Sequence, residues 1–126
     1  MEKHWKVLIV EGDPLLALSM REVLTLVGFE IAGIAASVSE ALRLAGDTRP
    51  DLAIFDVRLA GRRDRIEGAA LLRECYGVPA VFVTGQADEA TRQRASQVGA
   101  VGYLDKPVHP KELIKVVEAT IGRPPD

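Results

Sequence analysis

The sequence alternates between short apolar runs and longer segments with helical spacing of apolar side chains. Continuous apolar runs occur at 7–10, 31–35, 52–55, 80–83 and 101–104. Such runs are typical of strands that are covered on both faces. Strands that alternate with helices form a parallel sheet with helices on both sides. The alternation therefore predicts an α/β domain.

Helix signals lie between these runs and after the last one. The first helix is predicted to begin at Pro14, since proline suits a first turn, and to end at Gly28. The second is predicted to begin at the capping box formed by Ser37 and Glu40 and to end at Gly46. Three further helices are predicted at 66–75, 88–98 and 110–121.

The amino-acid composition excludes several classes of protein. A chain of 126 residues fits one domain, and 48% hydrophobic with 27% charged residues exclude a disordered chain. The single cysteine, Cys75, excludes an internal disulfide and favours a reducing cytoplasm. The longest stretch without charge, 75–87, is too short to span a membrane. We expect a domain at 1–121, with 122–126 as a tail or the start of a linker.

Polar residues follow four of the predicted strands. Because ligands of an open α/β sheet bind beyond the carboxyl ends of its strands, these residues are expected to converge. They are Glu11, Asp13, Asp56, Thr84, Asp105 and Lys106. Clustered carboxylates repel each other unless a cation lies among them, and Mg²⁺ suits such oxygen ligands. A carboxylate beside Mg²⁺ and a lysine can attack phosphorus and form an acyl phosphate.

The chain resembles the response-regulator receiver domains of bacterial two-component signalling over about residues 5–121. The resemblance rests on the order and spacing of four segments, 7–11, 50–56, 83–85 and 99–107. It implies a flavodoxin-like, doubly wound, five-stranded parallel sheet of order 2-1-3-4-5 with five helices in a single domain.

The same resemblance implies roles for individual residues. Asp56 matches the phosphate-accepting aspartate, and Thr84 and Lys106 match the hydroxyl and the lysine that act on the phosphoryl group. The Lys106–Pro107 bond is expected to be cis. Thr84 and Tyr103 match the switch residues that turn inward on activation.

The resemblance also implies a Mg²⁺ site, with one departure from the family pattern. Its expected ligands are Glu11, Asp13, Asp56 and the backbone carbonyl of Arg58. Family members usually carry two adjacent acids after the first strand, but Gly12 occupies the second of these positions. Asp13 lies one residue further on and could instead serve the turn before the first helix, with helix-dipole benefit.

The expected function is a signalling switch rather than an enzyme. A histidine kinase or phosphotransfer protein would phosphorylate Asp56, and a downstream protein would recognise the changed surface. That surface comprises 88–98, 101–104 and 110–121, which also form the expected face of a phosphorylation-dependent homodimer. The net charge of −2 argues against sequence-independent nucleic-acid binding, and neither nucleic acid nor a membrane is an expected direct partner.

Two alternatives remain open from the residues. Gly12 favours a pseudo-receiver, an interaction module with weak or no Mg²⁺-dependent phosphorylation. A phosphatase with a nucleophile after its first strand shares the threonine and lysine roles, but it needs Asp-x-Asp where this chain has Glu11-Gly12-Asp13. The arginines of 58–65 are either a solvated loop or a contact for a kinase or phosphodonor.

Overall fold

The computed structural model describes residues 4–57, 63–85 and 89–122. The strands are β1 (Lys6–Val10), β2 (Glu30–Ala35), β3 (Leu52–Val57), β4 (Ala80–Thr84) and β5 (Gly102–Asp105). The helices are α1 (Pro14–Leu26), α2 (Val38–Thr48), α3 (Arg63–Tyr76), α4 (Glu89–Gln97) and α5 (Pro110–Ile121). Among these helices, none combines the length and the hydrophobicity that crossing a membrane requires.

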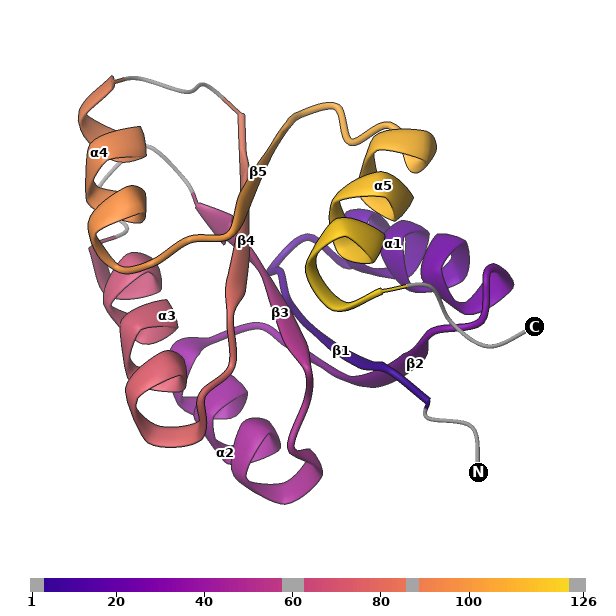
Figure 1. The fold of residues 1–126 in the computed structure, drawn as a ribbon, viewed down its shortest axis with the longest axis horizontal. Coiled ribbons are helices and arrows are strands. Elements are labelled where there is room, and N and C mark those ends of the chain that lie inside the picture. Colours follow the sequence, from indigo (N-terminus) through magenta and orange to yellow (C-terminus); the bar gives the residue numbers. More distant parts are fainter. Residues whose placement is uncertain (1–3, 58–62, 86–88, 123–126) are drawn as a thin grey trace.

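The strands form one parallel sheet of order β2-β1-β3-β4-β5. Figure 1 shows α1 and α5 on one side of this sheet and α2, α3 and α4 on the other. The arrangement confirms the predicted fold class and strand order.

Two apolar clusters fill the space between the sheet and its helices. Successive side chains of a strand point to opposite faces, so each central strand contributes to both clusters. The cluster on the side of α2, α3 and α4 includes Leu8, Phe55 and Phe82. The cluster on the side of α1 and α5 includes Ile9, Ile54 and Val81. This packing fixes the strand ends that carry the polar residues.

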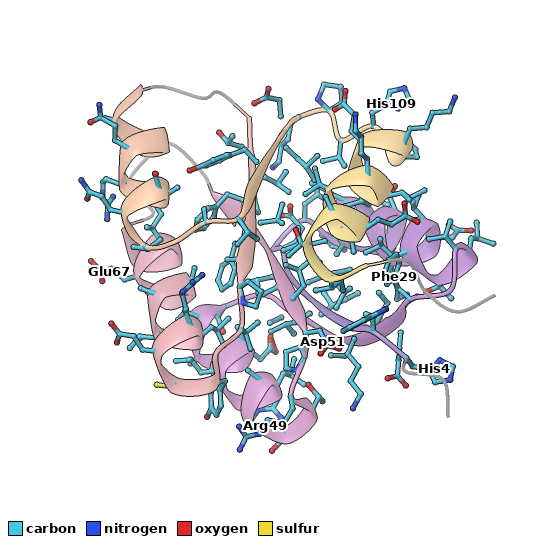
Figure 2. All side chains as sticks on the ribbon, in the orientation of Figure 1. His4, Phe29, Arg49, Asp51, Glu67 and His109 are labelled. Atoms are coloured by element: carbon cyan, nitrogen blue, oxygen red, sulfur yellow. The ribbon has the colours of Figure 1, made fainter. Side chains whose placement is uncertain are left out.

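The predicted end of the second helix is wrong. Helix α2 continues past Gly46 to Thr48 and is capped by Arg49 in the left-handed region, with φ 53°. A Cβ on Gly46 would lie 3.0 Å from the Tyr76 hydroxyl oxygen, so glycine permits a close approach of α2 and Tyr76. The Arg49 guanidinium also lies 5.2 Å from the centroid of the Tyr76 ring. Figure 2 shows Arg49 at this end of the molecule.

Two strand ends also differ from the prediction in a way that matters for the site. Strand β3 extends through Asp56 to Val57, and Asp56 pairs in register with Val83. Strand β5 begins at Gly102 and extends to Asp105, which pairs with Thr84. Asp56 and Thr84 are therefore held within the hydrogen-bonded sheet rather than in the loops that follow it.

Candidate functional site at the carboxyl edge of the sheet

Polar residues from four strands meet at one edge of the sheet. Glu11 follows β1, Asp56 lies near the end of β3, Thr84 ends β4 and Lys106 follows β5. In the described part of the chain, the buried polar residues are Glu11, Asp56 and Thr84, which are 2%, 1% and 2% exposed. Acidic side chains are almost never fully buried without a partner, so their presence here marks a site rather than ordinary packing.

Lys106 supplies positive charge to the two buried carboxylates. Its Nζ lies 2.8 Å from Asp56 Oδ1 and 3.9 Å from Glu11 Oε1. The lysine side chain is 30% exposed, whereas both carboxylate side chains are fully buried. One ammonium therefore faces two carboxylates from the solvent side, so the group carries an excess negative charge when both acids are ionised.

This environment raises the pKa of the Glu11 carboxyl above its ordinary value. Burial is the largest cause, and the adjacent Asp56 carboxyl raises the pKa further through its charge and a side-chain contact. The Asp13 N–H, which donates to Glu11 Oε2 at 3.0 Å, and the charge of Lys106 act in the opposite direction. Glu11 Oε1 is buried and accepts no hydrogen bond from the residues described.

Glu11 and Asp56 are suited to hold a cation, because two adjacent carboxylates repel each other when no cation lies between them. A divalent ion would relieve their repulsion and use the buried Glu11 oxygen, and Mg²⁺ commonly takes one or two carboxylates and keeps several waters. Across the part of the chain that is described, no three side chains of His, Cys, Asp or Glu group together as metal ligands. Among the described residues, the site thus brings two carboxylates together rather than three.

Asp13 has a different position from Glu11 and Asp56. Its Oδ1 accepts the Leu15 N–H at 3.0 Å, and Asp13 is the N-cap of α1 with Pro14 at the start of the helix. Aspartate before Pro14 is a recognisable capping signal in the sequence. The remaining expected ligand, the carbonyl of Arg58, lies outside the described residues, as does most of the arginine-rich segment.

The expected switch residues, Thr84 and Tyr103, lie on the face of the sheet that α2, α3 and α4 cover. Strand alternation places Thr84 on the face of Phe82, and the half-buried Tyr103 packs against the same apolar cluster. The Lys106 N–H donates to the Thr84 carbonyl at 2.9 Å, which links the two sides of the site through the backbone. The Lys106–Pro107 bond is cis, as the resemblance implies.

The histidines take no part in this site. His4 and His109 are both exposed, and Figure 2 shows them well apart, His4 near the N-terminus and His109 beside the start of α5. Each is therefore a surface residue, as their sequence context indicates.

A comparison with known families decides the classification. The family model of the response regulator receiver domain matches residues 7–118. The chain belongs to the response regulator receiver domain family. It is thus a receiver domain of two-component signalling, a class of signalling proteins rather than of classical enzymes, as its sequence resemblance implied.

Curated relatives of this receiver domain are bacterial regulators. The chain is 36% identical over 118 residues to the transcriptional regulatory protein PdtaR of Mycobacterium tuberculosis, covering 94% of this chain and 57% of the relative. It is 36% identical over 121 residues to the DNA-binding response regulator MtrA of Mycolicibacterium smegmatis, covering 96% and 52%. The receiver domain therefore spans just over half the length of these relatives.

Solved structures support the same assignment. The signal receiver domain of a modulated diguanylate cyclase from Desulfovibrio desulfuricans superposes with a TM-score of 0.85 at 39% identity, covering 94% of both chains. A CheY-like receiver domain protein from Methanospirillum hungatei gives a TM-score of 0.84 at 27% identity, covering 93% of both.

Proposed function

We propose that Asp56 accepts a phosphoryl group from a histidine kinase or a phosphotransfer protein in the cytoplasm. The observation that carries the proposal is the contact of 2.8 Å between Lys106 Nζ and the buried Asp56 carboxylate at the carboxyl edge of the sheet. An Asp56 oxygen attacks the phosphorus of a phosphohistidine, the P–N bond breaks, and the imidazole nitrogen takes a proton. The product is an acyl phosphate on Asp56.

The neighbouring side chains have defined parts in this transfer. The Lys106 ammonium offsets negative charge on the phosphoryl oxygens, and the Thr84 hydroxyl donates to one of them. Glu11 and Asp56 would hold Mg²⁺, and Asp13 and the carbonyl of Arg58 are further proposed ligands. When bound, Mg²⁺ supplies positive charge at the phosphoryl oxygens.

Phosphorylation then changes the surface that partners recognise. The phosphoryl group adds roughly −1.5 to −2 charge, which draws Thr84 toward it and shifts the population between two packings of Tyr103. The backbone hydrogen bond between Lys106 and Thr84 supports this coupling. A downstream protein, or a second phosphorylated copy, binds α4, β5 and α5. We assign residues 1–121 to this domain and 122–126 to a tail or linker start.

The decisive experiment measures phosphoryl incorporation by intact mass after incubation with Mg²⁺ and a small phosphodonor. Wild type is expected to gain one phosphoryl group and Asp56→Asn none. Asp105→Asn is the matched control because Asp105 is an exposed acid at the same edge, and it is expected to behave as wild type. Equal incorporation in wild type and Asp56→Asn contradicts the assignment.

A second candidate function rests on Gly12 and on the pairing of only two carboxylates in the described pocket. It is a pseudo-receiver, which binds partners through the same fold without phosphoryl transfer. This candidate is favoured if folded wild type takes up no phosphoryl group from small donors or from phosphorylated proteins and shows no measurable Mg²⁺ affinity.

A further inference from the structure

The outer face of α1 is unusually apolar for a solvent-facing helix surface. Three of the five large apolar side chains that are exposed in the described part of the chain lie on α1, and they are Leu15 (79%), Leu18 (44%) and Leu26 (81%). The opposite face of α1 is buried through Ala17, Met20 and Leu24. The exposed leucines are therefore additional to those that hold the helix on the sheet.

A surface hollow of about 470 Å³ lies on the same face. It is lined by Leu18, Arg21, Glu22, Thr25 and Leu26. The first four have the spacing i, i+3, i+4 and i+7, which is the set that surrounds a hole in knobs-into-holes packing. Helix α1 thus presents both a hole and a row of apolar knobs on one face, as a helix that packs against another helix does.

The charges beside this hollow indicate which helix fits it. Arg21 and Glu22 are both exposed and adjacent in sequence, so the face carries one positive and one negative charge side by side. In a contact with a two-fold axis, each residue of one copy meets the complementary residue of the other. An antiparallel second copy of the same helix therefore matches this face in shape and in charge.

We propose that the outer face of α1 binds the same face of a second copy of this chain, antiparallel and about a two-fold axis. In this contact Leu18 of each copy enters the hollow of the other, and Leu15 packs near Leu26 of the second copy. Arg21 pairs with Glu22 across the axis twice. The surface is separate from the face formed by α4, β5 and α5.

The area that this contact can bury indicates how tightly the two copies are expected to bind each other. Helix α1 has 13 residues, so it is about 20 Å long. A contact between two helices of this length falls below the roughly 1,200 Å² of the smaller stable interfaces. The dimer is therefore weak, reversible and dependent on protein concentration.

Sedimentation equilibrium from micromolar to millimolar concentration tests the proposal on the unphosphorylated chain. Wild type is expected to self-associate to a dimer, and Leu18→Gln is expected to weaken association at least about tenfold, the factor that 1.4 kcal/mol represents. Leu71→Gln is the matched control, because Leu71 on α3 is 41% exposed against 44% for Leu18, and it should leave association unchanged. Circular dichroism checks that each variant is folded.

Charge exchange gives an independent test. Arg21→Glu and Glu22→Arg are each expected to weaken the dimer by placing like charges across the axis, and the double variant is expected to restore it. Wild type that stays monomeric at millimolar concentration overturns the proposal. Failure of the double variant to recover overturns it as well. A dimer that survives Leu18→Gln but is lost in Val101→Gln places the interface beside the start of β5, where Val101 lies near Val116 of α5, and also overturns it.

Discussion

Lys106 Nζ contacts Asp56 Oδ1 at 2.8 Å although β4 stands between β3, which carries Asp56, and β5, which precedes Lys106. Neighbouring strands are about 4.8 Å apart, so the lysine side chain reaches over the end of one whole strand. The strand that it crosses ends in Thr84, whose carbonyl accepts the Lys106 N–H. A change in charge at Asp56 therefore acts directly on a residue two strands away.

Replacing Glu11 by Gln is expected to stabilise the metal-free protein near pH 8. The pKa of Glu11 is raised in the folded state, so the native protein holds this proton more tightly than the unfolded chain does. Ionised Glu11 therefore lowers the free energy of unfolding at pH values above its raised pKa. We expect Glu11→Gln to be more stable than wild type by on the order of 1 kcal/mol there.

The difference in stability between Glu11→Gln and wild type should shrink as the pH falls through the raised pKa of Glu11 toward the ordinary value of 4.5. At that pH the Glu11 carboxyl of wild type is protonated and therefore uncharged, as Gln is. Urea unfolding across this range measures it. Glu67→Gln is the control, since Glu67 is exposed and Figure 2 shows it on the outer side of α3. A stability difference between Glu11→Gln and wild type that grows toward acid pH contradicts the electrostatic account.

Magnesium is expected to stabilise the folded state, and more strongly after Gly12→Asp. A ligand that binds only the native state at ten times its Kd adds about 1.4 kcal/mol to the free energy of unfolding. An added carboxylate beside Glu11 supplies another oxygen ligand, so the variant should bind more tightly. Calorimetric titration suits this test better than tryptophan fluorescence, because Trp5 precedes β1 whereas Glu11 follows it. Equal affinities would show that position 12 does not face the metal.

We expect Asp13 both to cap helix α1 and to strengthen Mg²⁺ binding through its negative charge. Two different substitutions can separate these contributions. Asp13→Ala removes the oxygen that accepts the Leu15 N–H and should cost about 1 kcal/mol in unfolding experiments without metal. Asp13→Asn keeps an acceptor oxygen and should lose little stability, while its lost charge weakens Mg²⁺ binding. Unchanged Mg²⁺ affinity in Asp13→Asn would restrict Asp13 to the cap of α1.

The sequence was sufficient to predict the sheet and the gathering of Asp56 and Lys106 at one edge. Both follow from local signals, because continuous apolar runs predict buried parallel strands and the residues after them must share an edge. The end of α2 was not predictable in this way. Gly46 is an ordinary stop signal in sequence, and only the approach of the distant Tyr76 explains a glycine inside the helix.

The position of Asp13 illustrates a second limit. Spacing from the strand alone does not determine whether a carboxylate turns toward the pocket or toward the following helix. The N–H groups at the start of α1 can also bind the Asp13 carboxylate. In the described structure, one oxygen of this carboxylate, Oδ1, accepts the Leu15 N–H. The arrangement of exposed leucines on α1 also lay outside sequence reasoning, since the same residues could have formed part of the core.

The division of the site between the two sides of the sheet has a mechanical consequence. Glu11 and Asp56 continue the strand positions that face α1 and α5, whereas Thr84 and Tyr103 belong to the opposite side. The sheet between them is tightly packed, and close-packed interiors do not deform continuously. The proposed effect of a phosphoryl group on Asp56 would therefore reach the side of α4 over the edge of the sheet, through Thr84 and its backbone hydrogen bond with Lys106, and not through the packed interior.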